Sequence, residues 1–108
     1  MNRGDIYLVS LDPTKGHEQQ GYRPVLIVSP EAFNIASGMA VVCPITTGGA
    51  FAKRLGFVVE ITGIQTTGIV RCDQPRTMDL SARHARKIDK LPDVLLDEVL
   101  ARVITLFE

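Results

Sequence analysis

Turn-forming residues interrupt the apolar stretches of this chain roughly every 8–12 residues, a spacing typical of a small all-β barrel or sandwich. The stretches between the turns are rich in Val, Ile, Leu and Tyr, which favour strands. At 108 residues the chain can bury one core, and we expect a single domain over residues 1–108. Apolar residues make up 45% of the sequence, which excludes a disordered chain.

The first half of the chain predicts three strands. Asp5–Leu11 is rich in strand-forming residues, and Pro24–Ser29 is apolar almost throughout, so the latter should be covered on both faces. Pro30–Gly38 predicts one helical turn with its proline at the first position. Ala40–Ile45 predicts a strand whose proline should place it at a sheet edge, or end it.

The second half predicts shorter strands and then a helix. Phe57–Ile61 and Gly68–Cys72 flank a turn, and Arg76–Leu80 and Ala85–Leu91 are weaker strand candidates. Apolar residues then recur at helical spacing, which predicts an amphipathic helix from about Pro92 to Leu106. Its apolar stripe is wide for so small a barrel, so part of it is expected to face a second subunit.

Charge and cysteine content narrow the class of protein. The net charge is zero, but residues 71–90 hold six basic and three acidic side chains, which fits either a confined anion site or a solvated rim. Cys43 and Cys72 lie in apolar runs and are expected to be reduced core thiols. Because no apolar run approaches the ~20 residues of a membrane span, we expect a cytoplasmic protein.

The most informative segment for chemistry runs from Ile69 to Arg76. Alternate residues of a strand share a face, so Val70 and Cys72 should face the core. Ile69, Arg71 and Asp73 should then face outward, with a guanidinium and a carboxylate side by side at the strand end. The spacing alone fits a surface ion pair as well as a catalytic pair.

Two polar loops add to this segment. The loop 15–24 contains His17, which could donate to a phosphate oxygen or simply be exposed to solvent. The turn 46–49 (TTGG) could offer hydroxyls and backbone amides to an anion, whereas His84 in a basic run is expected to be exposed. Nucleotide-binding loops, metal-ligand spacings and carboxylate clusters are absent. Arg, Asp, His and Thr side chains suit metal-independent phosphate-ester chemistry in which a neighbouring hydroxyl is the nucleophile.

Four segments together resemble the MazF/PemK family of toxins, the toxin halves of bacterial type II toxin–antitoxin pairs. They are residues 3–6 (RGDI), 11–21 (LDPTKGHEQQG), 23–28 (RPVLIV) and 73–76 (DQPR). Residues 67–77 (TGIVRCDQPRT) make the resemblance closest to the Kid/PemK branch. It runs from about Arg3 through the final helix, and only the combination of segments is specific.

The resemblance implies an SH3-like small β-barrel with a C-terminal α-helix, acting as a homodimer. It also implies sequence-specific cleavage of single-stranded RNA, chiefly messenger RNA, without a metal or other cofactor. The implied protein partner is a cognate antitoxin with an acidic disordered segment. Kid-like relatives favour U-A-containing sites, which we adopt as the expected substrate.

The family's functional residues map onto this sequence one by one. The catalytic set corresponds to His17, Arg71 and Asp73, while members lacking it rely more on residues matching Arg23 and Thr47. The RNA contacts correspond to Glu18, Arg23, Thr46, Thr47, Phe57, Thr67 and Ile69. The turn before Thr66 is about two residues shorter than in the Kid-like pattern, and residues 84–85 replace small glycines of that branch.

The chemistry follows from the groups themselves. Asp73 is the candidate general base for the ribose 2′-hydroxyl, whose attack gives a 2′,3′-cyclic phosphate and a 5′-hydroxyl. With a pKa above about 12, Arg71 is more easily a stabiliser of phosphorane charge than a general acid. A neighbouring arginine should lower the pKa of Asp73, which makes it a weak base and turnover slow.

Two other functions remain open at this point. The first is a non-catalytic barrel that binds nucleic acid or protein, and the second is a gyrase poison like the toxin CcdB, which has a related fold. Neither function needs the Arg71, Asp73 and His17 set, so that set favours the ribonuclease.

Overall fold

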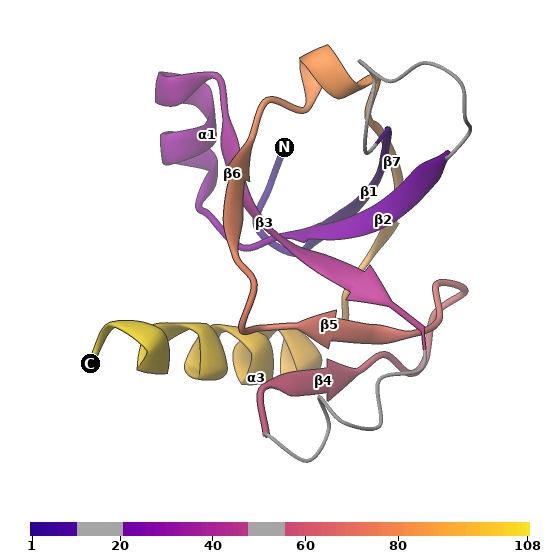
Figure 1. The fold of residues 1–108 in the computed structure, drawn as a ribbon, viewed down its shortest axis with the longest axis vertical. Coiled ribbons are helices and arrows are strands. Elements are labelled where there is room, and N and C mark those ends of the chain that lie inside the picture. Colours follow the sequence, from indigo (N-terminus) through magenta and orange to yellow (C-terminus); the bar gives the residue numbers. More distant parts are fainter. Residues whose placement is uncertain (11–20, 48–55) are drawn as a thin grey trace.

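Strands dominate the computed structural model of this protein, which describes residues 1–10, 21–47 and 56–108 (Figure 1). The strands are β1 (Asp5–Ser10), β2 (Tyr22–Ile27), β3 (Ala40–Thr46), β4 (Val58–Glu60), β5 (Ile69–Arg71), β6 (Arg76–Met78) and β7 (Arg86–Lys90). The helices are α1 (Glu31–Ser37) and α3 (Asp93–Ile104), with the 3₁₀ turns η1 (Ser81–Arg83) and η2 (Thr105–Phe107). No helix of the described ranges is long and apolar enough to cross a membrane.

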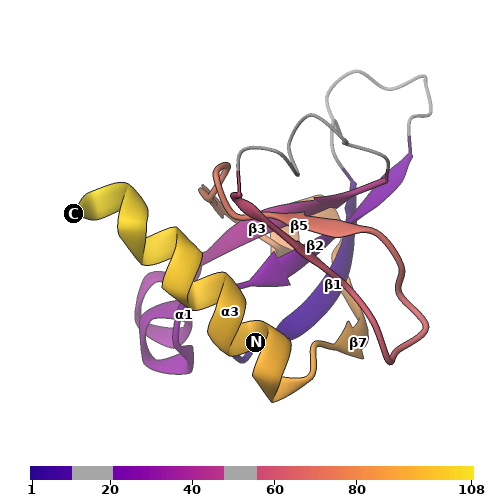
Figure 2. The same ribbon diagram turned by 90° about the horizontal axis from the view of Figure 1, so that it is seen from below.

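All seven strands belong to one antiparallel sheet in the order β4-β5-β3-β2-β1-β7, with β6 pairing β3 beside this path. The sheet curls around the core, and α3 lies across it beside β4 (Figure 2). The expected mainly β fold with a C-terminal helix is therefore confirmed. Within the described residues, backbone hydrogen bonds do not join the two ends of the path, so the barrel is open between β4–β5 and β7.

The two faces of β2 pack into two different buried clusters. Leu26 packs with Ile6, Val70 and Val99 in one buried cluster, which α3 helps to cover. The preceding and following residues of β2 instead join a second buried cluster with Met78. Adjacent residues of a strand point to opposite faces, so both faces of β2 are buried from residue 25 to residue 27, as the apolar sequence predicts.

Two prolines lie differently from the sequence expectation. Pro30 caps α1 in an extended conformation instead of forming its first residue, and the helix runs for seven residues instead of one turn. The expected edge position of β3 is wrong, because β3 pairs with β2 on one side and with β6 and β5 on the other. Pro44 lies between the β6-paired and β5-paired residues, where β3 changes partner, so its missing N–H interrupts neither ladder.

The two cysteines are free and fully buried in the same core cluster. Burial raises the pKa of Cys43 to about 12 and that of Cys72 to about 11. Both side chains are therefore protonated thiols at neutral pH, and their free, buried state confirms the expectation of reduced core cysteines.

Candidate active site

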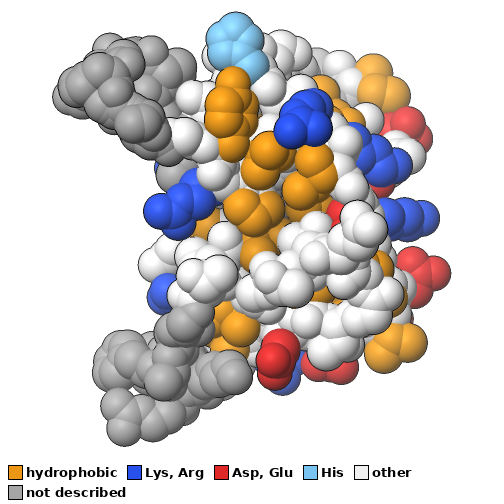
Figure 3. All heavy atoms as spheres, turned by 90° about the vertical axis from the view of Figure 1, so that its right-hand side faces the viewer, with side chains coloured by type: hydrophobic (Ala, Val, Ile, Leu, Met, Phe, Trp, Pro, Cys, Tyr) orange, Lys and Arg blue, Asp and Glu red, His pale blue; other side chains and the backbone are white. Residues whose placement is uncertain are grey.

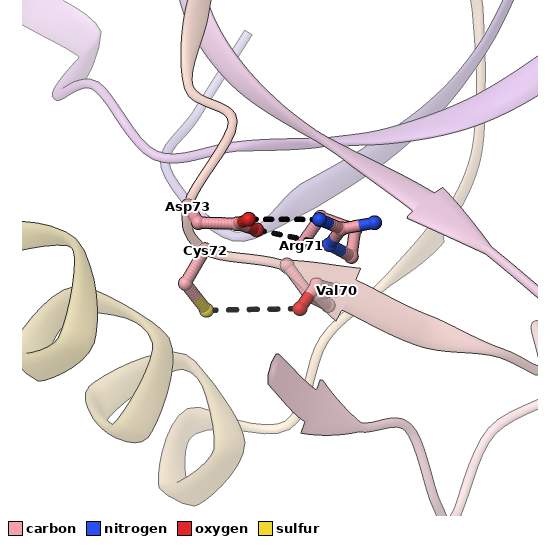
Figure 4. Close-up of polar contacts among 4 residues, drawn as sticks. All are labelled: Val70, Arg71, Cys72 and Asp73. Carbon is pink, nitrogen blue, oxygen red and sulfur yellow. Dashed lines mark hydrogen bonds and ion pairs between the residues drawn. The ribbon is translucent and has the colours of Figure 1, made fainter. Parts of the chain in front are cut away.

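The side chains of Arg71 and Asp73 bind each other at the end of β5 (Figure 4). Arg71 Nε donates to Asp73 Oδ1 at 2.9 Å, and Arg71 Nη2 donates to Asp73 Oδ2 at 2.7 Å. The two side chains are 21% and 24% exposed, so the pair is partly covered yet open to a ligand. Such a bidentate, charge-assisted pair has a much better defined geometry than an ordinary surface ion pair.

Backbone contacts around Cys72 hold this pair in place. The Cys72 amide donates to the Phe57 carbonyl at 2.9 Å, and the Gln74 amide donates to the Arg71 carbonyl at 3.2 Å, which closes a turn directly after β5. The Cys72 thiol contacts the Val70 carbonyl at 3.7 Å and lies on the α3 side in Figure 4. Burial of the thiol on that side leaves Arg71 and Asp73 on the partly exposed side.

The alternation predicted for this segment holds for four of the five residues from Ile69 to Asp73. Val70 and Cys72 are buried, and Arg71 and Asp73 are partly exposed. The prediction that Ile69 faces outward is wrong, because its exposed fraction is 4%. Strand alternation fixes the face on which a side chain lies, but neighbouring strands can still cover that face.

The pair shifts the pKa of both of its members. Hydrogen bonds from Arg71 hold the pKa of Asp73 below its ordinary value, although partial burial acts in the opposite direction. The same hydrogen bonds raise the pKa of Arg71 above its ordinary value. Asp73 is thus a carboxylate and Arg71 a cation at neutral pH, and the lowered pKa expected for the aspartate is confirmed.

The strand pairing brings other predicted site residues close to β5. Thr46 at the end of β3 is the register partner of Ile69, and Phe57 lies directly before β4. Gly68 lies against the end of β3, because a Cβ at this position would be 2.6 Å from the Thr46 carbonyl oxygen. Thr67 is exposed immediately before this close contact.

The remaining predicted residues are less closely tied to the pair. Thr47 is exposed just after β3, and Arg23 is an exposed residue of β2, on the far side of β3 from β5. His17 and Glu18 lie outside the described residues. His84 is exposed, as expected, in a left-handed conformation with φ 52°.

One polar contact near this site has no signal in the sequence. Asp89 Oδ2 on β7 accepts hydrogen bonds from the Thr66 amide at 3.0 Å and from the Thr66 hydroxyl at 2.9 Å. The partners are separated by 23 positions, so only the assembled sheet brings them together. Elsewhere in the described ranges, no group of three or more His, Cys, Asp or Glu side chains could hold a metal ion.

Known proteins resemble this chain over nearly its whole length. The chain is 56% identical to the endoribonuclease PemK of Escherichia coli over 108 residues, covering 98% of this chain and 81% of that protein. It is 46% identical to the endoribonuclease toxin ChpB of Escherichia coli strain K12, covering 98% and 93% of the two chains. A crystal structure of MazE-MazF from Deinococcus radiodurans superposes with a TM-score of 0.86 at 31% identity, covering 99% and 95% of the chains.

Residues 2–107 match a family model described as "PemK-like, MazF-like toxin of type II toxin-antitoxin system". The match spans every described strand and helix, including β5 and the turn that carries Asp73. This chain therefore belongs to the family of PemK-like, MazF-like toxins of type II toxin–antitoxin systems.

Proposed function

We propose that this protein is an endoribonuclease toxin that cleaves single-stranded RNA, chiefly messenger RNA, at specific sequences and without a metal ion. The observation that carries the proposal is the bidentate Arg71–Asp73 pair, open to a ligand at the end of β5. The two relatives described above, both named endoribonucleases, support it and disfavour a gyrase poison or a purely binding barrel. Residues 1–108 would act as one domain in the cytoplasm, where messenger RNA is present.

The proposed reaction needs only the groups of this chain and the RNA. Asp73 takes the proton of the ribose 2′-hydroxyl, and the freed oxygen attacks the adjacent phosphorus. The bond from phosphorus to the 5′-oxygen then breaks, and that oxygen takes up a proton, leaving a 2′,3′-cyclic phosphate and a 5′-hydroxyl. His17 is the candidate donor of this proton or an orienting group, and Arg71 stabilises the charge that develops on the phosphorane.

The bound RNA must change the Arg71–Asp73 pair before chemistry occurs. In the free protein, both carboxylate oxygens of Asp73 accept hydrogen bonds from Arg71, which makes Asp73 a weak base. A phosphate bound beside Arg71 would compete for the guanidinium and raise the pKa of the carboxyl group, also by its own charge and by excluding water. This need for rearrangement fits a slow enzyme.

The proposed RNA contacts form two groups. Thr46, Thr47, Phe57 and Thr67 lie at or near the ends of β3, β4 and β5, and would contact the nucleotides around the cleaved bond. Arg23 on β2 would bind a phosphate, whereas Glu18 would accept a hydrogen bond from a base or a ribose hydroxyl. Because Ile69 is buried, we do not propose a contact from its side chain.

The test of this function is incubation of the purified protein with a mixed RNA in EDTA, followed by mapping of the new ends. We expect cuts at recurring, U-A-containing sequences with 2′,3′-cyclic phosphate and 5′-hydroxyl ends. RNA that stays intact, or cuts that need an added metal ion, would contradict the proposal.

We further propose that the protein acts as a homodimer through the C-terminal part of α3. Ile104 and Phe107 are 58% and 77% exposed, although they continue the apolar stripe of this helix. They border a pocket of about 300 Å³ lined by Arg3, Val28, Leu100, Val103, Ile104 and Phe107. A second copy of the chain would remove this apolar surface from water.

Phe107→Asp is expected to convert the dimer into a monomer, because it places a carboxylate in the apolar contact. Light scattering at micromolar concentration measures the change. Val94→Asp is the matched control, since Val94 is 72% exposed at the other end of the same helix, and this variant should remain dimeric. A wild-type protein that is monomeric at that concentration would refute the dimer.

The proposed antitoxin contact uses the basic segment of the chain. Arg76, Arg86, Lys87 and Lys90 are exposed in the described structure, and Figure 3 shows Lys and Arg side chains beside hydrophobic ones on one face of the molecule. An acidic, disordered antitoxin segment would bind such a surface and compete with RNA phosphates. The solved MazE-MazF complexes support an antitoxin as the partner.

A further inference from the structure

The hydrogen bonds between Asp89 and Thr66 link two parts of the sheet that no backbone ladder connects. Asp89 lies on β7, at one end of the strand order, and Thr66 lies in the turn between β4 and β5, at the other end. A single carboxylate oxygen of Asp89 accepts two hydrogen bonds, one from the amide and one from the hydroxyl of Thr66. The gap in the open barrel is therefore bridged by a side chain.

A bulge in β7 lies directly beside this contact. Ile6 pairs with Asp89, whereas Tyr7 pairs with Lys87, so Ile88 is the extra residue. Bulges reorient the neighbouring side chains of a strand and often occur where one side chain has a particular role. Asp89 is half-buried, and its neighbours Ile88 and Lys90 are exposed.

The hydrogen bonds also keep Asp89 charged. Burial raises the pKa of Asp89, but the hydrogen bonds from the amide and hydroxyl of Thr66 lower it, and the resulting pKa lies below the ordinary value. At neutral pH the contact is therefore charge-assisted, the stronger class of hydrogen bond.

Thr67 lies between two fixed points of the chain. On one side, Thr66 is held by Asp89, and on the other, Gly68 lies against the Thr46 carbonyl. The Gly68 carbonyl accepts the Ile61 amide at 3.0 Å, which closes the same turn. The exposed Thr67 is thus carried by a backbone segment that hydrogen bonds hold on both sides.

A threonine whose backbone is held in place suits recognition of a base edge. Attraction between opposite charges tolerates displacement, but a hydrogen bond weakens steeply when its angle falls toward about 120°. Phosphate contacts position a nucleic acid, whereas hydrogen bonds to bases specify its sequence. Thr67 carries no charge, so its contribution to RNA binding depends on its orientation.

We infer that Asp89 is a positioning residue for RNA recognition: by holding Thr66 it orients Thr67, and so helps to determine which RNA sequence is cleaved. The inference rests on the proposed ribonuclease function. It concerns the choice and affinity of substrate, because the Arg71–Asp73 pair is held by different contacts: its own two hydrogen bonds, the bond from the Cys72 amide to Phe57 and the bond from the Gln74 amide to Arg71.

The test compares Asp89→Ala with wild type in three measurements: cleavage-site distribution on a mixed RNA, affinity for a cleavage-resistant 2′-deoxy analogue, and single-turnover rate at saturating RNA. We expect the sites to become less selective and the affinity to fall by about 10-fold, since Thr67 loses its orientation and with it the proposed hydrogen bond to the RNA. The saturating rate should stay within about 3-fold of wild type, because the catalytic pair is intact.

Variants at Thr66 separate positioning from a general effect on folding. Thr66→Val removes the hydroxyl and should shift the sites in the same direction as Asp89→Ala, whereas Thr66→Ser keeps the hydroxyl and should restore the wild-type pattern. Asp97→Ala is the matched control, an exposed aspartate on α3 that should change none of the three measurements. If Asp89→Ala does not fold, the comparison of Thr66→Val with Thr66→Ser tests the positioning role by the same three measurements.

The outcomes distinguish the inference from the function on which it rests. Unchanged site selection in Asp89→Ala, or an equal loss of rate at every site with selectivity kept, would overturn the positioning role alone. A wild-type protein that leaves RNA intact would overturn the ribonuclease proposal, and the positioning role with it.

Discussion

Asp73→Asn is expected to slow RNA cleavage by about 10²–10⁴-fold, the usual contribution of a general base. The substitution keeps the shape of the side chain and an acceptor for Arg71, but it removes the charge that is proposed to accept the 2′-hydroxyl proton. RNA affinity should hold or rise, because a negative charge near the phosphate is gone. Single-turnover cleavage and binding of a 2′-deoxy analogue measure the two effects.

Arg71→Ala tests the other half of the pair. It should lower both cleavage rate and RNA affinity, since it removes the cation proposed to bind the phosphate. If the pair were only a surface ion pair, each variant would change the free energy of unfolding by less than about 1 kcal/mol and leave cleavage intact. Glu98→Gln is the matched control, because it weakens the Glu98–Arg102 ion pair on α3 and should cleave like wild type.

The same pair makes stability depend on pH in a defined direction. Arg71 lowers the pKa of Asp73 in the folded protein below its ordinary value of 3.8. The stabilisation by the charged carboxylate is therefore complete above that ordinary value and is lost as the pH falls through the folded pKa. The difference in melting temperature between wild type and Asp73→Asn should shrink in that acid range and stay constant near neutral pH.

Replacing the ribose on the 5′ side of the cleaved phosphate by deoxyribose is expected to stop cleavage at that bond. The substitution removes the proposed nucleophile but leaves the phosphate and both bases, so the affinity should change little. A synthetic RNA with this single change, followed by gel analysis of the products, measures the effect. The matched control carries the deoxyribose one nucleotide further toward the 3′ end and should be cut normally.

The outcome of this experiment separates two classes of nuclease. Cleavage of the deoxy substrate at the wild-type rate would mean that water attacks the phosphorus, and the role given to Asp73 would be wrong. Loss of cleavage with retained binding would support attack by the 2′-hydroxyl.

Local patterns in the sequence predicted most of the fold and the centre of the site. Arg71 and Asp73 are two positions apart at the end of a predicted strand, so strand alternation continued into the following turn places them together. The helix α3 follows from its apolar spacing in the same way, and the Asp93–Ile104 span agrees with the predicted range.

The predictions failed where the answer depends on neighbouring strands. The covering of Ile69 and the central position of β3 follow from which strands pair, and no local pattern contains that information. The contact between Asp89 and Thr66 was missed for the same reason, since it joins opposite ends of the strand order. The roles given to His17 and Glu18 stay predictions, because both residues lie outside the described part of the chain.

The close approach of Gly68 to the Thr46 carbonyl has a consequence for genetic selection. Every missense change of a glycine codon adds a Cβ, and at φ +125° and 2.6 Å from a backbone oxygen no Cβ fits. In a screen for cells that survive expression of this toxin, changes at codon 68 would abolish toxicity because the protein does not fold. Such cells would contain little soluble toxin. Survivors with changes at codon 73 would instead accumulate folded, inactive toxin that still binds its antitoxin.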